Sequence, residues 1–533
     1  MPPNPQNNGK PLQWLLALPV EVRLTIVAGL LLRIVLAITT RYTSEDYMIT
    51  LRYAENLAHG HGLVYNVGER VLGTTTPLYT LLLALAEWLR LSPTWFGKSL
   101  NICADGALCL LVYLWLAHEG RERAGRIAAF ICAVHPLHLQ WSISGMETEL
   151  VTATGVWSWF AFARRKEMEL FAALGILFLL RWDSLLMAGV IVAALLWRDR
   201  AVPWRGICLF VVIVSPWLIV AGRYYGNPIP VTGQAKVIVY GWFADHDPDS
   251  SIRFEATADG HGLSTIAQLE PTWLLRRLPR QQKLLNAFTG TVPAFILSVA
   301  ACAGLVTLVQ SRRGALLPAA IWAVIYVAAF LVSRVLLFNW YLVPPLPIYE
   351  MLAAIGLSAG IERMPSTAPQ WLRSAMIAAL LLGAAIGCGV ATGLTLRRSQ
   401  RIEENARILA GKWLNGNSGP ADRVLLEPIG YIGYYSHRYV IDTIGLVSPQ
   451  VLRFYAGAPH SPWLAQIRYY QPEWCVLRPG EVRKLDEASQ IEGFDWRSMY
   501  SLAHVKKYAP APNEEPFEFR IYRRVRSTAP PRE

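Results

Sequence analysis

Long apolar runs repeated along most of the chain are the feature that most limits how this sequence can fold. About eleven such runs occur, and hydrocarbon tolerates only segments that satisfy their own backbone polar groups, as helices do. They lie at residues 22–40, 98–117, 126–141, 150–163, 170–180, 185–197, 206–222, 291–309, 315–332, 340–358 and 374–395. The sequence therefore predicts an α-helical polytopic membrane protein with about eleven transmembrane helices.

The charge pattern indicates how these helices are oriented. A net charge of +12 would favour nucleic-acid binding in a soluble protein. Here, however, Lys and Arg gather in short clusters between the apolar runs, at 121–126, 164–166, 198–205, 312–313 and 363–373. These clusters share one side if the N-terminus is cytoplasmic, as the positive-inside rule requires. We therefore expect a cytoplasmic N-terminus and no nucleic-acid partner.

Two segments need a special placement to keep that alternation. Residues 74–91 look like a span, and we interpret them as an interfacial helix on the outer face. The runs 170–180 and 185–197 form a hairpin in this interpretation. At 1.5 Å per residue its arms are too short for a hydrocarbon core of about 30 Å, so its tip, Arg181–Ser184, should lie below the outer surface and line a wet cavity.

The chain divides into two predicted domains. Residues 1–395 form the transmembrane domain, with outer loops 41–97 and 223–290, and residues 396–533 form an extracytoplasmic α/β domain. In the second domain we expect a helix at 401–414 and strands at 423–428, 438–443, 473–478 and 517–524. No Walker loop or GxGxxG motif occurs, which argues against a nucleotide-driven pump.

A polar loop after the first apolar run carries the first candidate site. It includes the adjacent carboxylates Glu45 and Asp46, together with Arg52. Ionisable groups at a membrane boundary are costly to keep and usually have a function. Solvated caps at a helix end are the competing interpretation of Glu45 and Asp46, and we favour function because the loop holds so many polar groups.

Other charged residues could belong to the same face. Glu147 is either catalytic or an ordinary charge at a helix N-terminus, and Arg181 with Asp183 could be a structural ion pair. Lys236 and Arg334 are single cations that, as a set, could bind a phosphate at the membrane surface. His135-Pro136-Leu137-His138 has the wrong spacing for a helical zinc pair, so we interpret it as a helix-end turn.

Several of these segments resemble the bacterial branch of the GT-C superfamily, membrane glycosyltransferases that use polyprenyl-phosphate sugars. The resemblance is carried by an acidic pair followed by RYAENL, GHGLVYN and GERV within 45–71. Supporting segments are SGMET at 144–148, RWDSLL at 181–186, NPIPVTGQAK at 227–236 and NWYLVPPLP at 339–347. The chain is most similar to mycobacterial terminal arabinofuranosyltransferases, and more distantly to aminoarabinose transferases and protein O-mannosyltransferases.

Two positions depart from the pattern of that family. Its members carry two aspartates at the acidic pair, whereas this chain has Glu45 and Asp46. They often have Arg-Pro-Glu or Arg-Pro-Asp where this chain has Arg181-Trp182-Asp183. Both changes keep the charge and alter the geometry, so they bear on the substrate more than on the reaction.

The resemblance implies an inverting hexosyl- or pentosyltransferase of the bacterial inner (plasma) membrane with a periplasmic active site. It would move a sugar from a polyprenyl-phosphate donor to an acceptor hydroxyl of a cell-envelope glycan, lipid or protein. Glu45 or Asp46 would accept the hydroxyl proton. The residues expected to bind substrate and phosphate are Arg52, Glu147, Arg181, Asp183, Lys236 and Arg334.

Two further questions stay open at the level of sequence. A divalent metal held by the acidic residues could assist, but the sequence supplies no dedicated ligand set, so no cofactor is certain. A transporter or flippase of lipid-linked sugars is the alternative function. That class predicts broken, polar helices near the bilayer midplane, whereas we expect the ionisable residues of this sequence to gather on one face.

Overall fold

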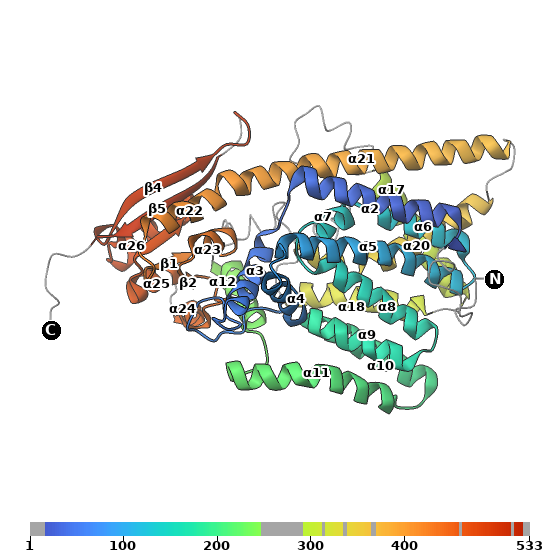
Figure 1. Ribbon diagram of the computed structural model, residues 1–533, viewed down its shortest axis with the longest axis horizontal. Coiled ribbons are helices and arrows are strands. Elements are labelled where there is room, and N and C mark those ends of the chain that lie inside the picture. The colour runs from blue at the N-terminus through green and yellow to red at the C-terminus, as the bar shows by residue number, and fades with distance from the viewer. Residues whose placement is uncertain are drawn as a thin grey trace.

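The structure is a computed structural model that describes residues 16–246, 292–311, 315–333, 338–363, 369–457, 461–512 and 516–525. Helices form one elongated body, and a mixed α/β domain lies at one end of it (Figure 1). The helices of the body are α2 (Val20–Thr40), α5 (Pro93–His118), α6 (Glu122–Val134), α7 (Pro136–Ser142), α8 (Thr148–Ala163), α9 (Glu167–Leu180), α10 (Leu185–Asp199), α11 (Trp204–Tyr225), α17 (Val292–Ser311), α18 (Leu316–Val332), α19 (Asn339–Leu342), α20 (Leu346–Arg363) and α21 (Gln370–Asn405).

These helices cover the apolar runs expected from the sequence. Two runs are interrupted, one by Pro136 between α6 and α7 and the other by Pro344 and Pro345 between α19 and α20. Proline lacks the N–H that would continue a helix. Among the described residues, α2, α5 and α11 are each long and apolar enough to cross a membrane, and shorter apolar helices accompany them. The full number of crossings stays a prediction.

The basic loops between α5 and α6, between α8 and α9 and between α10 and α11 lie at the end of the bundle opposite the α/β domain (Figure 1). Arg121 donates to Ser311 Oγ at 3.4 Å, and Arg123 pairs with Glu362 at 3.4 Å. Between the next two loops, Arg165 lies 3.7 Å from Asp199. The described clusters at 121–126, 164–166 and 198–205 therefore lie on one side of the bundle, as the charge pattern predicts.

The hairpin predicted at 170–197 is confirmed. After α9, a short 3-10 turn, η1 (Trp182–Ser184), reverses the chain into α10. Arg198, near the end of α10, donates to the carbonyl of Phe162 at 3.2 Å, just before α9 begins. Both arms thus start and finish at the basic end, and the tip lies at the other end.

Three helices lie between the bundle and the α/β domain: α3 (Glu45–Ala58), α4 (Pro77–Trp88) and α12 (Val231–His246). The 12 residues of α4 span about 18 Å, which is less than the hydrocarbon core, in keeping with an interfacial helix. The remainder of the expected outer loop 223–290, from residue 247 on, is outside the described residues.

A five-stranded sheet forms the C-terminal domain, in the order β2-β1-β3-β5-β4. β1 pairs in parallel with β2 and β3, while β5 is antiparallel to β3 and β4. The four expected strands are confirmed, and β4 is a strand that the sequence analysis missed. The elements are α22 (Arg407–Asn417), β1 (Arg423–Leu426), α23 (Tyr431–Ser436), β2 (Tyr439–Asp442), η4 (Pro449–Val451), α24 (Leu452–Gly457), α25 (Pro462–Tyr470), β3 (Trp474–Leu477), α26 (Pro479–Glu492), η5 (Trp496–Ser498), β4 (Tyr500–Tyr508) and β5 (Phe517–Arg524).

Helix α21 joins the two parts without a break. It runs along α2, where added Cβ atoms on Gly389 and Gly393 would meet Leu32 and Leu36, and continues toward the sheet (Figure 1). The expected boundary between residues 395 and 396 therefore falls inside a helix. The expected helix at 401–414 is divided at Ala406 between α21 and α22.

The sidedness of the bundle predicts which positions an impermeant thiol reagent reaches in intact cells. Val67 and Ile491 are exposed on the α/β-domain side, and Arg123 is exposed at the basic end. With a cytoplasmic N-terminus, Val67→Cys and Ile491→Cys should be labelled from outside, above the background of the unsubstituted protein. Arg123→Cys should be labelled only after the membrane is opened, and labelling of Arg123→Cys in sealed cells would reverse the orientation.

Candidate active site

The start of α3 divides the acidic pair between two environments. The Ser44 side chain caps the helix by accepting from the Tyr47 amide, at 3.3 Å, so both carboxylates stand in the first turn, where the helix dipole favours negative charge. Neighbouring helical residues point about 100° apart. Asp46 therefore lines a cavity, whereas Glu45 faces the C-terminal domain and accepts from the amide of Tyr431 at 3.2 Å.

The cavity has a volume of about 390 Å³ and lies where α3, α12 and the α9–α10 tip meet. Its lining brings together residues from distant parts of the chain. The polar side chains that matter for chemistry are those of Asp46, Glu147, Arg181, Asp183, Lys236 and Tyr341. Five of these were candidates from the sequence, and the hairpin tip lines a cavity as expected.

Arg181 occupies the centre of the polar contacts. Its Nε lies 3.1 Å from Asp183 Oδ1, its Nη1 lies 3.7 Å from Glu147 Oε1, and its guanidinium stacks 4.7 Å from the Tyr341 ring centroid. The Arg181–Asp183 pair expected from the sequence is thus present. Nη1 is buried and makes no hydrogen bond within the described part of the protein. This N–H group can therefore donate a hydrogen bond to an anionic ligand.

Lys236 supplies the second cation of the cavity. Its Nζ donates to the Tyr341 hydroxyl at 3.0 Å and lies 5.6 Å from the Phe338 ring centroid. Burial works against its charge, but Tyr341 and Asp46 outweigh it and raise the pKa of Lys236 above its ordinary value. The ammonium group is therefore retained at neutral pH.

Asp46 is the cavity carboxylate best suited to take a proton. Burial raises its pKa above the ordinary value of an aspartate, while Lys236 and Arg181 act in the opposite direction. A raised pKa makes a carboxylate a stronger base. Glu147 and Asp183, by contrast, are engaged by Arg181, and Asp183 also accepts from the Tyr326 hydroxyl at 2.8 Å.

Glu45 and Arg52 connect α3 to the C-terminal domain instead of lining the cavity. Burial raises the pKa of Glu45 to about 8, with Arg407 acting against it. Arg52 is buried and donates to the carbonyls of Tyr65, Gly433 and Arg438 at 2.8, 2.6 and 2.6 Å. The geometry thus gives both residues contacts between domains.

One predicted residue cannot be placed, and two tyrosines at the cavity were not predicted. Arg334 is outside the described residues. Sequence reasoning missed the hydroxyls of Tyr326 and Tyr341, which hold Asp183 and Lys236 in place. Tyr341 lies in the NWYLVPPLP segment that supports the family resemblance, so the sequence offered a reason to select it. Tyr326 lies in an apolar run with no motif around it.

Comparison with known proteins shows what this architecture is. Residues 395–522 match a family model described as a domain of unknown function, DUF8728. A terminal β-(1→2)-arabinofuranosyltransferase of Mycobacterium tuberculosis (strain ATCC 25618 / H37Rv) is 27% identical over 227 residues, 37% of this chain. The match spans about a third (35%) of that relative's length.

Two solved structures superpose on most of this chain. ArnT from Cupriavidus metallidurans, bound to undecaprenyl phosphate, superposes with a TM-score of 0.57 at 14% identity, covering 96% of this chain and 99% of that one. The Archaeoglobus fulgidus oligosaccharyltransferase tethered to an acceptor peptide gives 0.54 at 12% identity, over 93% and 74%. The chain has the GT-C fold of membrane glycosyltransferases. It is a distant homologue of the mycobacterial arabinofuranosyltransferase, so the resemblance seen in the sequence is confirmed.

The contacts of Arg52 predict a structural effect of its removal. Hydrogen bonds from a charged donor contribute about 1.5–3 kcal/mol each. Arg52→Met should therefore weaken the contact between the C-terminal domain and α3. Limited proteolysis should then cut the purified protein faster than the wild type. Arg70→Met, at an exposed arginine in the loop that follows α3, is the matched control. Wild-type protease resistance together with lost donor binding would instead make Arg52 a ligand for substrate.

Proposed function

We propose that the chain is an inverting glycosyltransferase that moves a sugar from a polyprenyl-phosphate donor to an acceptor hydroxyl on the outer face of the membrane. One observation carries the proposal: Asp46 shares a single cavity with the two cations Arg181 and Lys236. Glycosyl transfer from a phosphate needs both kinds of group, a base for the acceptor and positive charge for the leaving group.

The reaction follows from these positions. The acceptor oxygen attacks the anomeric carbon from the face opposite the phosphate, forming the new C–O bond while the bond from carbon to phosphate oxygen breaks. Asp46 takes the hydroxyl proton. The electron pair leaves with the lipid phosphate, whose growing charge is met by Arg181 Nη1 and the Lys236 ammonium. Tyr341 and Asp183 hold these cations in place before reaction.

A second cavity next to the first suits the lipid part of such a donor. It measures about 480 Å³ and its lining is apolar, including Leu57, Leu63, Leu179, Trp217 and Val220. Leu179 lies two residues before Arg181, and Pro77 of this cavity follows Thr76 of the polar one. An isoprenoid chain in the apolar cavity would place its phosphate near the two cations.

The relatives support the same donor class. ArnT shares the fold and was solved with undecaprenyl phosphate, and the homologue in M. tuberculosis is an arabinofuranosyltransferase. We extend this to a pentose or hexose donor and an acceptor in the cell envelope, with the protein in the inner membrane of a bacterium. Membrane lipids then surround the bundle.

A divalent metal has no fitting ligand set in the described part of this cavity. Glu147 and Asp183 pair with Arg181, and Asp46 faces Lys236, so each carboxylate already has a cation nearby. Among the described residues, the groups whose ligand atoms come close enough to share one ion lie elsewhere. In the proposed reaction, Arg181 and Lys236 supply the positive charge.

A lipid-linked sugar transporter is the second candidate because one sequence argument against it was wrong. Ionisable residues do not crowd one face alone: Arg33, Asp105 and Glu350 lie inside the bundle, buried in α2, α5 and α20. Buried polar groups in membrane helices are a feature of transporters as well. Transfer activity separates the two functions.

The acidic pair provides that test. Asp46→Asn keeps the size of the side chain and removes the proton acceptor, so transfer should fall about 10²- to 10⁴-fold while the donor still binds. Glu45→Gln changes a residue outside the cavity and should lower the transfer rate less than Asp46→Asn does. Purified protein is assayed with a lipid-linked sugar that the wild type uses. Wild-type transfer by Asp46→Asn would remove Asp46 from the mechanism and favour the transporter.

The two cations should contribute most when the phosphate leaves. Lys236→Met and Arg181→Met should each lower kcat, by about 10²-fold or more, with a smaller change in KM. Arg223→Met, an exposed arginine at the end of α11, is the control and should turn over normally. A change in KM alone would confine these cations to substrate binding.

A further inference from the structure

A second group of ionisable side chains is buried inside the bundle and has no part in the proposed reaction. Each member is at most 1% exposed, and each comes from a different helix. The group consists of Arg33 (α2), Asp105 (α5), Cys132 (α6), His138 (α7), Glu149 (α8) and Glu350 (α20). Charges buried at this depth require partners or bound ions, because hydrocarbon does not solvate them.

Arg33 and Asp105 are explained by the break between α6 and α7. Pro136 has no N–H, so the carbonyl of Cys132 loses its helical donor. Arg33 replaces it, donating to the carbonyls of Cys132 and Ala133 at 3.2 and 2.7 Å, and pairs through Nε with Asp105. The expected helix-end turn is present at His135 alone, which lies between the two helices as the N-cap of α7, whereas Pro136 to His138 form the first turn of α7. The contacts of Arg33 leave His138, Cys132 and Glu350 without an equivalent structural reason.

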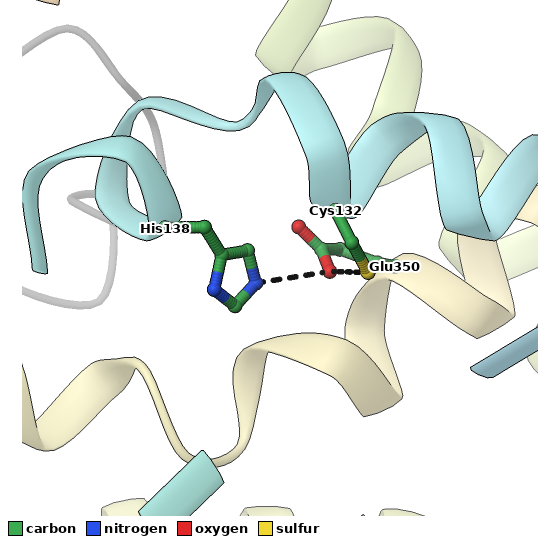
Figure 2. Close-up of side chains that lie close together, drawn as sticks. All are labelled: Cys132, His138 and Glu350. Atoms are coloured by element: carbon green, nitrogen blue, oxygen red, sulfur yellow. Dashed lines mark hydrogen bonds and ion pairs between the residues drawn. The ribbon is translucent and has the colours of Figure 1, made fainter. Parts of the chain in front are cut away.

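Those three side chains converge on one point (Figure 2). Glu350 Oε2 lies 3.3 Å from His138 Nε2 and 2.8 Å from Cys132 Sγ. The three ligand atoms all lie within 4.8 Å of one another. The other carboxylate oxygen, Glu350 Oε1, is buried and makes no hydrogen bond within the described part of the chain. An unfilled carboxylate oxygen thus stands beside a thiol and an imidazole.

We infer that Cys132 Sγ, His138 Nε2 and the Glu350 carboxylate bind a divalent metal ion of the zinc type. Thiolate, imidazole and carboxylate are the ligands that zinc uses in proteins. Tetrahedral zinc with bonds of about 2.0–2.1 Å separates a nitrogen and an oxygen ligand by about 3.3–3.4 Å. The Nε2–Oε2 separation of 3.3 Å fits that value, whereas Sγ would move outward from Oε2 on binding.

Glu149 supplies the outer support that such a histidine needs. Its two carboxylate oxygens lie 3.0 and 3.1 Å from His138 Nδ1. Holding the proton on Nδ1 leaves the lone pair of Nε2 directed at Glu350, the carboxylate–histidine–metal arrangement common in zinc sites. A site on the other side of the ring, with Asp105, is less suitable, because Arg33 already places a positive charge there.

The position of the site connects it to the polar cavity. The ion would join α6, α7 and α20, and through Glu149 the start of α8, where Glu147 enters the cavity. A bound ion would thereby help to fix the position of the start of α8, and with it Glu147, beside the cavity.

Cobalt provides a direct test that does not depend on activity. Full-length protein, purified in detergent, stripped with chelator and loaded with Co²⁺, should show a thiolate-to-cobalt charge-transfer band at one ion per chain. Zn²⁺ should abolish the band by competition. Cys132→Ser should lack the band. Cys109→Ser should keep it, because Cys109 is a buried cysteine of the same bundle that belongs to neither group of closely spaced metal-ligating side chains.

A second variant guards against misfolding. Glu149→Gln should weaken cobalt binding about 10- to 100-fold without removing the band, because it alters only the support of His138. Size-exclusion profiles must match the wild type for each variant compared. Absence of the band in wild-type protein, or its persistence in Cys132→Ser, would overturn the metal site and leave His138 as a structural partner of Glu149 and Glu350.

Discussion

A charged side chain is stable in a low-dielectric interior only when a group of opposite charge lies beside it. This requirement determines how the helices pack, both inside the bundle and around the cavity. Inside the bundle, Arg33 pairs with Asp105 and supplies donors to the carbonyls freed by Pro136. At the cavity, Arg181 pairs with Asp183. An unpaired buried ion costs several kcal/mol, so each pair fixes the relative position of the helices that carry it.

The same condition explains how the cavity obtains its cations. Because the arms of the α9–α10 hairpin are too short for a hydrocarbon core of about 30 Å, we expect the tip, with Arg181, to lie below the outer surface. Helix α12 then brings Lys236 to the same cavity, where Tyr341 contacts both cations. The first turn of α3 separates two adjacent carboxylates by direction, so that Asp46 faces the cations and Glu45 faces the C-terminal domain.

Much of this arrangement could be predicted from sequence because its signals are local. Apolar runs, basic clusters and short arms predicted the helices, their alternation and the hairpin, and alternating patterns predicted four strands. Strand β4 escaped because it is a mostly exposed edge strand with lysines in its sequence, YSLAHVKKY. The contacts of Arg52 and the cluster around His138 escaped because their partners are distant in sequence. Only tertiary packing brings Glu350 to His138, 212 residues away.

The central claim is that the polar cavity holds the phosphate of a polyprenyl-phosphate lipid, and a structure determined with that lipid tests it most directly. The account predicts phosphate density within hydrogen-bonding distance of Arg181 Nη1 and the Lys236 ammonium, with the chain entering the apolar cavity beside Leu179 and Trp217. Phosphate density elsewhere on the protein, with these two cations unoccupied, would contradict it.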